Sequence, residues 1–379
     1  MVNRYDVSTT KKYVSELIRR NGVPKEKADI SSYVLVEADM RGISSHGINN
    51  LDLLVLSSIK DGGTFPDAIP IDVTRNPDYP IRHIDAKGDL GHPPAMKAVS
   101  LVKELARKYG IAKVYIYNAN HFGAAAIYSE NIAEDKYLAG RVTCTTPALV
   151  IPYGGNKKRL GTNLVSWSIP YDKGIITIDM ASTVHAVSGI VKAIVEDKQL
   201  PFPVYDSQRN LTLNPKSFKN YQDFLSNGSM VPLGGLFGEG QGPKADSGYK
   251  GSGLSMLIEL DNVIGGGFSQ YVSPTVHDKG RWIRQSFEAW RIDTLFPQDQ
   301  AIREISRTVD DIRAYGGKNM LLPGEKETKD RKDAIINGIP YEDIQIGRLE
   351  GSATEVGMAR LKPVNKEAIL KNKDGESKR

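Results

Sequence analysis

The chain has 379 residues, 40% of them hydrophobic and 25% charged, and its 50 Lys and Arg against 45 Asp and Glu give a formal net charge of +5. This composition is ordinary for a globular protein, and the basic residues are interspersed, which disfavours nucleic acid as a partner. A single cysteine, Cys144, excludes an intrachain disulfide, and no run approaches the roughly 18 apolar residues of a membrane-spanning helix. We therefore expect a cytoplasmic protein with no membrane partner.

Helix and strand patterns alternate along the chain without an internal repeat, which is typical of an α/β fold. Apolar residues recur three and four apart until glycine or proline interrupts them. Six glycines and prolines in 62–80 predict a connection between structural units. The predicted helices are 8–20, the segment after Pro24 through Ala38, 95–109, 123–137, 251–267 and 298–315, the last being the final long helix of the body, and the predicted strands are 113–117, 140–146 and 174–181.

Two histidines and one aspartate lie where predicted elements end. His46 belongs to "DMRGISSHGINN" (39–50), after the second helix, and His121 belongs to "NANHFG" (118–123), after a short strand. Asp179 ends the strand "GIITIDMA", where a carboxylate is costly unless it is hydrogen-bonded or ion-paired. Taken singly, each residue also fits a structural role at the end of an element.

Glycine-rich strings in the middle of the chain invite a test for a dinucleotide-binding motif. The Rossmann fingerprint G-x-G-x-x-G after a strand is absent, since "GEGQG" (238–242) and "GYKGSG" (248–253) have other spacings. Gly251 nevertheless allows close backbone approach at the start of a helix, with Lys250 beside it to meet an anion. Alone, this signal equally fits a glycine-rich loop before a buried helix.

Taken in order, the motifs of the chain resemble those of a known family. The matching strings are "ADMRGISSHG", "NANHFG", "PYGG", "GTN", "IDMAS", "PLGG", "GYKGSGL" and "PGEKE", from Ala38 to about Glu327. The set resembles the type-2 malate/L-lactate dehydrogenase family, which also includes ureidoglycolate and sulfolactate dehydrogenases, diketogulonate reductase and piperideine-carboxylate reductases. Each motif is short, but their shared order is specific.

The resemblance implies a non-Rossmann α/β fold of the malate/L-lactate dehydrogenase type. A central mixed or antiparallel sheet would form the cofactor domain, and a helical N-terminal domain would support dimerisation. The implied homodimer has active sites near the subunit interface. The implied limits are 1–75 for an N-terminal helical segment with the catalytic loop, 76–140 and 300–361 for a substrate and dimerisation domain, 141–299 for a nicotinamide-cofactor domain, and 362–379 for a charged tail.

The resemblance also implies a reaction, the interconversion of a small 2-hydroxy acid and its 2-oxo acid with NAD or NADP. Such a reduction needs a proton for the carbonyl oxygen, and imidazole, with an unperturbed pKa of about 6.5, can supply it near neutrality. His46 carries over the active-site histidine of "SHG". His121 competes for the same role, and we favour His46 slightly.

Other site residues follow from the same resemblance. Asp179 would orient a histidine or bind the cofactor, Arg41 would neutralise a substrate carboxylate, and Ser45 would stabilise the turn or meet the substrate. The expected cofactor contacts are Thr145, Asn163, Asp179, Met180, Ala181, Lys250, Gly251, Gly324 and Glu325. No spacing of His, Cys and carboxylates predicts a metal site.

One departure from the family pattern bears on the substrate. Many relatives have Arg four residues after the histidine of "SHG" and Tyr four residues further, where this chain has Asn50 and Leu54. Asn50 can donate hydrogen bonds to a carboxylate but brings no charge. Two alternatives therefore remain: reduction of a cyclic imine carboxylate, and a cofactor-binding protein without turnover.

Overall fold

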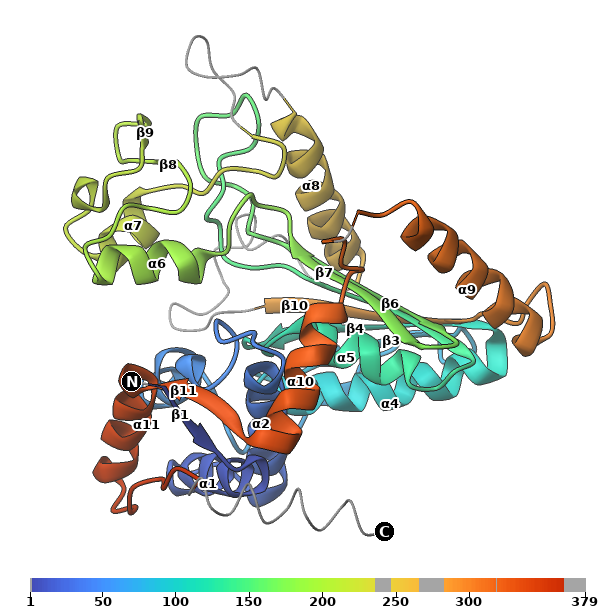
Figure 1. The fold of residues 1–379 in the computed structure, drawn as a ribbon, viewed down its shortest axis with the longest axis horizontal. Coiled ribbons are helices and arrows are strands. Elements are labelled where there is room, and N and C mark those ends of the chain that lie inside the picture. The colour runs from blue at the N-terminus through green and yellow to red at the C-terminus, as the bar shows by residue number, and fades with distance from the viewer. Residues whose placement is uncertain (1, 236–246, 266–282, 318, 365–379) are drawn as a thin grey trace.

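The computed structural model describes residues 2–235, 247–265, 283–317 and 319–364, and a seven-stranded sheet lies at its centre (Figure 1). The strand order is β2-β3-β4-β10-β5-β6-β7. The β3 and β4 strands pair in parallel, and the other neighbours pair antiparallel, so the sheet is mixed. The strands are β2 (Ile71–Asp72), β3 (Ile81–Asp85), β4 (Ile111–Ala119), β5 (Leu138–Cys144), β6 (Leu164–Tyr171), β7 (Gly174–Ala181) and β10 (Ile283–Arg291).

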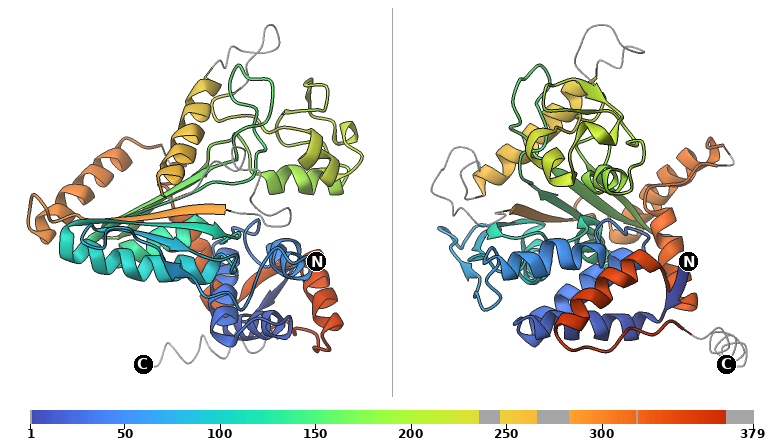
Figure 2. Two further views of the ribbon diagram at one scale, coloured as in Figure 1. Left: turned by 180° about the vertical axis from the view of Figure 1, so that it is seen from behind. Right: turned by 90° about the vertical axis from the view of Figure 1, so that its left-hand side faces the viewer.

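Helices cover both faces of this sheet (Figure 2). One face carries α4 (His92–Tyr109) and α5 (Ala125–Ala133), which contact β4, β5 and β10 and form the largest apolar core with them. The opposite face carries α8 (Gly248–Ile264) and α9 (Gln298–Ala314). The α4 helix ends at Gly110, whose φ of 87° suits glycine and whose N–H donates to the Ala106 carbonyl at 2.8 Å.

The two ends of the described chain meet in a second, mainly helical unit. Strand β1 (Val2–Tyr5) pairs antiparallel with β11 (Ile339–Glu342), so the start of the chain lies beside its late segment. This unit has its own apolar core. Its helices are α1 (Val7–Arg20), α2 (Lys25–Met40), the π-helical turn η1 (Leu51–Leu56), α3 (Ser57–Lys60), α10 (Glu325–Asn337) and α11 (Asp343–Glu355).

A third, smaller cluster of buried apolar residues lies at the far end of the sheet (Figure 1). It includes Val150, Ile190 and Phe224, which lie far apart in the sequence. The elements around it are α6 (Val187–Val195), β8 (Val204–Tyr205), β9 (Leu211–Thr212), the 3-10 turn η2 (Pro215–Ser217) and α7 (Tyr221–Asn227).

The predicted class is confirmed, because the chain folds as an α/β protein with a mixed sheet and without a doubly wound Rossmann unit. The prediction that 298–315 is the last long helix is wrong, since α10 and α11 follow it. The α10 sequence "EKETKDRKDAIIN" has hardly any apolar face, and only Ala334 is buried in it, so periodicity could not reveal the helix. The predicted domain limits stay a prediction.

Three further predicted segments lie wholly or partly outside the residues that the structure describes. The "GEGQG" string and residues 266–267 of the predicted helix lie outside them. Of the predicted tail, residues 362–364 are described, and the Val364 N–H donates to the Arg4 carbonyl at 2.8 Å. Within the described ranges, no helix has the length and apolar character needed to cross a membrane.

Candidate active site

The loop that carries His46 begins where α2 ends in a glycine cap. Gly42 has φ of 73°, and the N–H groups of Gly42 and Ile43 donate to the carbonyls of Asp39 (3.0 Å) and Ala38 (2.9 Å). These two bonds make a Schellman motif, which satisfies the last helical carbonyls and redirects the chain. The His46 N–H then donates to the Ile43 carbonyl at 2.9 Å, so a second tight turn fixes the backbone of His46.

His121 lies in the loop between β4 and α5. The Gly123 N–H donates to His121 Nδ1 at 3.2 Å, which places the proton of the neutral ring on Nε2. Gly123 has φ of 82°, a conformation that glycine adopts without strain. The buried Asn120 amide donates to three backbone carbonyls at 3.0 to 3.2 Å. The loop therefore holds His121 in one orientation.

The structure brings the two candidate histidines together. The rings of His46 and His121 stack with centroids 5.5 Å apart and planes inclined by 26°. The Ser45 hydroxyl lies 2.8 Å from His46 Nδ1, which leaves Nε2 of His46 to exchange a proton with a ligand. Burial lowers the pKa of His46 to about 4, so this imidazole is neutral at cellular pH.

Asp179 meets the N-terminal end of α5, the helix that follows the His121 loop. Its Oδ2 accepts a hydrogen bond from the Ala126 N–H at 2.9 Å, where the helix dipole favours negative charge. Asp179 keeps solvent-accessible surface. Desolvation by the surrounding protein is nevertheless the main cause that raises its pKa to about 6, and the charges of Glu130 and Glu327 raise it further. Asp179 is therefore a group that titrates close to neutrality beside the histidine loop.

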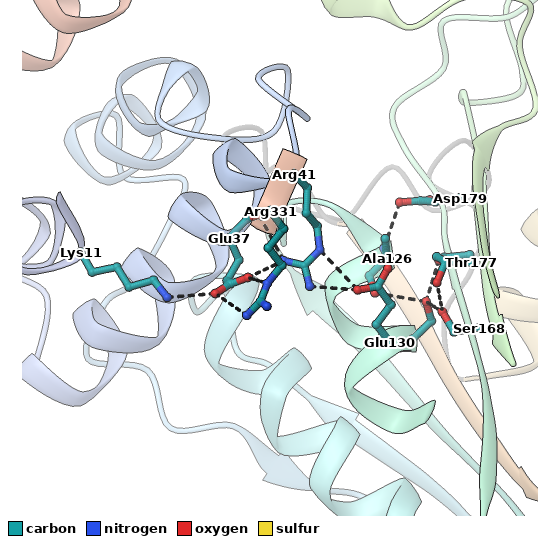
Figure 3. A network of polar contacts seen from close by, with 11 residues as sticks. Lys11, Glu37, Arg41, Ala126, Glu130, Ser168, Thr177, Asp179 and Arg331 are labelled. Atoms are coloured by element: carbon teal, nitrogen blue, oxygen red, sulfur yellow. Dashed lines mark hydrogen bonds and ion pairs between the residues drawn. The ribbon is translucent and has the colours of Figure 1, made fainter. Parts of the chain in front are cut away.

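Arg41 lies inside a network of buried charges (Figure 3). Its guanidinium group forms an ion pair with Glu37 on its own helix and another with Glu130 of α5 at 2.9 Å. Glu37 also binds Lys11 at 2.9 Å and Arg331 of α10 at 2.8 Å. The predicted substrate residue Arg41 is thus already paired with two carboxylates, and the network joins α1, α2, α5 and α10.

A chain of buried hydroxyl groups continues from α5 into the sheet (Figure 3). Ser129 lies 2.7 Å from the hydroxyl of Ser166 and 2.8 Å from that of Ser168 on β6, and Ser168 lies 3.1 Å from Thr177 on β7. Because hydroxyl groups both donate and accept, the chain satisfies its own members. It fixes β7, and with it Asp179, against α5.

The glycine-rich motifs meet at the N-terminal end of α8. The Leu233 N–H of "PLGG" donates to the carbonyl of Ser182 in "IDMAS" at 2.8 Å, and the Gly251 N–H donates to the Leu233 carbonyl at 3.1 Å. A Cβ on Gly251 would lie 2.4 Å from the Leu233 backbone, so only glycine fits there. The Tyr153 N–H of "PYGG" donates to the Ser252 hydroxyl at 2.8 Å. Four motifs that are distant in sequence thus form one surface after β7.

Asn163 of "GTN" is a fully buried link to the same helix. Its Oδ1 accepts from the Thr146 N–H at 3.0 Å, and its amide donates to the Ser255 carbonyl at 3.0 Å and to Glu259 at 3.1 Å. Every hydrogen atom of this amide has a protein partner. Asn163 therefore ties the loop at Thr146 to α8, and Thr145 is buried directly after β5.

The "PGE" segment packs on β7, two residues before the aspartate of the site. The Thr177 N–H donates to the Pro323 carbonyl at 3.2 Å, and Gly324 has φ of 85°. A Cβ on Gly324 would lie 3.1 Å from that of Thr177. Glu325 forms an ion pair with Arg313, so its carboxylate has a protein partner.

Lys250 is exposed in the first turn of α8, with its Nζ 5.8 Å from the Tyr249 ring centroid. A Cβ added to Gly253 would meet no atom of the described residues within 4 Å. An exposed cation at a helix N-terminus suits an anion, but the N–H groups of Lys250 and Gly251 already donate to the carbonyls of Ser247 and Leu233. Met180 and Ala181 continue β7 beyond Asp179, and Met180 is 38% exposed.

Ser45 and Asn50 lie in the His46 loop, as the prediction requires of substrate residues. Asn50 is half-buried and its N–H donates to the Gly47 carbonyl at 2.9 Å, just before η1 begins. Leu54 lies within η1 and is half-buried. Leu54, which stands where many relatives have Tyr, thus lies on the helical turn that follows the His46 loop.

Several residues of the site had no role in the sequence prediction. Asp39 and Gly47 support the His46 loop from behind, and Glu37 and Glu130 hold Arg41. A signal for Asp39 was present, because it is an acidic residue that follows the apolar run 33–36 near the end of the predicted helix. No sequence signal pairs Glu130 with α2, since 89 residues separate it from Arg41.

The described residues form an α/β protein with a pair of stacked histidines and a glycine-rich surface at the N-terminal end of α8. Residues 5–350 match the family model for malate/L-lactate dehydrogenase, and the chain belongs to this family of oxidoreductases.

Two curated relatives and one solved structure show the extent of the likeness. The chain is 27% identical over 350 residues to L-sulfolactate dehydrogenase of Methanothermobacter thermautotrophicus, covering 91% of this chain and 95% of the relative. It is 28% identical over 357 residues to malate dehydrogenase of Pyrococcus abyssi, with coverages of 92% and 94%. The structure of malate dehydrogenase from Pyrococcus horikoshii OT3 superposes with a TM-score of 0.80 at 26% identity, covering 95% of this chain and 97% of that one.

Proposed function

We propose that the protein transfers a hydride between NAD or NADP and a small 2-hydroxy or 2-oxo acid, with His46 as the proton donor and acceptor. The stacked pair of His46 and His121 supports this proposal, because it brings two titratable rings together, and Asp179 binds the first turn of the helix that follows the His121 loop. The cofactor supplies the hydride when it is bound. The chain itself then needs only to hold the acid, exclude water and move one proton.

His46 Nε2 is the atom that moves the proton. In oxidation, the neutral ring donates Nδ1–H to the Ser45 hydroxyl and takes the substrate hydroxyl proton at Nε2. In reduction, the imidazolium form gives this proton to the carbonyl oxygen. Burial lowers its pKa to about 4 in the free protein, which favours the base, and the negative charge of a bound acid would favour the imidazolium.

We assign Ser45 and Asn50 to the substrate side of the loop. Both are polar, half-buried and within four residues of His46. Asn50 offers a neutral donor where a charged partner would select strongly for a carboxylate. Arg41 already has two carboxylate partners, so a substrate acid would have to compete with Glu37 and Glu130 for it.

The residues around β7 fit a nicotinamide dinucleotide. Asp179 and Ser182 are three residues apart on extended chain, a span of roughly 10 Å, and Ser182 leads through Leu233 to the first turn of α8. A ligand lying along this path would reach from the histidine pair to Lys250. We therefore propose that Met180 and Ala181 line the cofactor and that Lys250 meets a phosphate or ribose oxygen.

A substrate screen tests the proposed function. The chain is mixed with NADH or NADPH and a panel of 2-oxo acids and cyclic imine carboxylates, and the nicotinamide absorbance is followed. We expect oxidation of one cofactor with a 2-oxo acid. Turnover with cyclic imines alone would replace the substrate class, and cofactor binding without turnover on any compound would contradict the proposal.

We further propose a homodimer that buries the outer face of α8. The residues of this helix that face the protein are largely small or polar, whereas its exposed residues are large and apolar, the reverse of a helix in a monomer. The inward residues are Gly248, Gly251, Ser252, Ser255, Ile258, Glu259 and Asn262, and the exposed apolar ones are Tyr249, Met256, Leu257, Leu260 and Ile264.

Light scattering after size exclusion tests the dimer. We expect the wild-type chain to elute with twice the mass of one chain, and the double variant Leu257→Glu/Leu260→Glu to elute as a monomer. Arg303→Glu on exposed α9 is the control and should remain dimeric. A monomeric wild type, or a dimeric double variant, would contradict the assignment of this face.

A further inference from the structure

Asp39 is a buried carboxyl group directly behind the His46 loop. It lies in the last turn of α2 and is 5% exposed. Its Oδ2 accepts two hydrogen bonds, one from the Ile48 N–H at 2.9 Å and one from the Tyr341 hydroxyl at 2.9 Å. Its Oδ1 is buried without a hydrogen-bond partner among the described residues. A buried carboxyl group with one unused oxygen is costly, so a structural need must keep it there.

Gly47 explains how the loop comes so close to this carboxyl group. A Cβ at residue 47 would lie 1.7 Å from Asp39 Oδ1 and 2.1 Å from its Cγ, whereas real contacts of this kind are longer than 3.0 Å. Only glycine therefore allows the backbone between His46 and Ile48 to rest on Asp39. His46, the candidate for proton transfer, directly precedes Gly47, and Ile48, whose N–H donates to Asp39, directly follows it.

We propose that Asp39 is a positioning residue for His46, and that Tyr341 anchors it from the late β11 strand. This inference rests on the proposed role of His46 in proton transfer. The two hydrogen bonds to Oδ2 tie the His46 loop to β11, 302 residues from Asp39 in the chain. The loop is otherwise held on this side by short turns of its own backbone.

The consequence for catalysis follows from geometry. The His46 ring must stack on His121 and keep Nε2 aligned with the substrate oxygen. A displacement of about 1 Å can lower a rate by roughly 10²-fold, because reacting atoms need a defined approach. Release of the Ile48 N–H would let the loop move as a unit, so proton transfer should suffer while the cofactor surface on α8 stays intact.

The ionisation of Asp39 decides which substitution is conservative. Burial raises its pKa to about 7, although the bonds from Ile48 and Tyr341 oppose the rise. Since Oδ2 already accepts two bonds, the proton of the neutral form resides on Oδ1. Asparagine can place its carbonyl oxygen where Oδ2 lies and its amide where the protonated Oδ1 lies, so Asp39→Asn preserves both hydrogen bonds.

The test compares kcat, KM and cofactor affinity in four variants, using the 2-oxo acid that the wild-type chain reduces fastest. We expect Asp39→Ala to lower kcat on the order of 10²-fold with an unchanged cofactor dissociation constant, and Asp39→Asn to restore kcat to within about threefold of wild type. Tyr341→Phe should lower kcat about fivefold, one hydrogen bond being worth about 1 kcal/mol. Tyr13→Phe is the matched control, because the buried Tyr13 hydroxyl has no hydrogen-bond partner among the described residues.

The outcomes separate this inference from the proposed function. If His46→Ala is inactive while Asp39→Ala and Tyr341→Phe keep wild-type kcat, the positioning role is overturned and the proposed function stands. If Asp39→Asn loses as much kcat as Asp39→Ala, the hydrogen bonds are not the cause and the inference fails. A wild-type chain without turnover, or an active His46→Ala, overturns both.

A thermal double-mutant cycle tests the contact without any activity. Gly47→Ala should lower Tm strongly in the wild-type background, because its Cβ collides with Asp39. In the Asp39→Ala background the same change meets no such atom and should lower Tm little. Equal effects of Gly47→Ala in the two backgrounds would show that the loop does not rest on Asp39.

Discussion

Replacement of Arg41 by methionine should unfold the protein at a clearly lower temperature. The Arg41 side chain is 7% exposed and its partners Glu37 and Glu130 are 2% and 15% exposed. Removal of one member of a buried ion pair costs about 3 to 5 kcal/mol, because a buried charge is left without compensation. Glu37 keeps Lys11 and Arg331, so we expect the lower value of about 3 kcal/mol. At about 2 °C per kcal/mol, Tm should fall by about 6 °C.

The assay is thermal unfolding followed by circular dichroism, together with KM for the 2-oxo acid. Arg303→Met is the control, since Arg303 and Asp299 form an exposed pair on α9, and it should change Tm by about 1 °C or less. An unchanged Tm with a KM raised tenfold or more in Arg41→Met would refute the structural reasoning and restore Arg41 as the partner of the substrate carboxylate.

Three other changes have definite expected outcomes. Gly324→Ala should lower the free energy of unfolding by about 1 to 2 kcal/mol and weaken cofactor binding in a fluorescence titration, because Gly324 has φ of 85° beside Thr177; unchanged stability would contradict this. Asn163→Ala should cost about 1 to 3 kcal/mol in urea unfolding, because the buried groups that it bonds lose their partner; a neutral change would mean that solvent replaces it. Burial lowers the pKa of His92 in the folded chain to about 4, whereas in the unfolded chain it is about 6.5. As pH falls between these two values, the unfolded chain is protonated there before the folded one, so the free energy of unfolding decreases toward pH 4. In His92→Leu the loss of unfolding free energy on acidification should be smaller by up to about 3 kcal/mol. If Tm falls with pH in parallel in the two proteins, His92 is not the cause of the loss.

The sequence predicted the elements whose ends carry glycine or proline. The helix capped by Gly110 and the strand 174–181 lie where the apolar pattern and the flanking glycines predict them. Strand β10 escaped prediction for a physical reason. It lies between β4 and β5, and it buries Arg284, Gln285 and Glu288, polar residues that interrupt the apolar run expected of a central strand.

For the site, the order of motifs identified the family and the candidate residues but not what each residue contacts. The competition of His46 and His121 for one role implied that they lie close together, and in the structure their rings stack. The pairing of Arg41 with Glu130 depends on how α2 packs against α5, and the bond between Asp39 and Tyr341 depends on how β11 returns to β1. Such long-range pairings follow from the packing of the whole chain, so a single sequence does not specify them locally.

The most direct test of the central claim is the kcat of His46→Ala on the 2-oxo acid that the wild-type chain reduces fastest. If His46 transfers the proton, kcat should fall by roughly 10² to 10⁴-fold with cofactor affinity preserved, while His121→Ala falls less and His83→Ala, a histidine stacked on Tyr115 in the sheet, stays near wild type. Near-normal kcat in His46→Ala, with the loss in His121→Ala instead, would contradict the assignment and give the proton to His121.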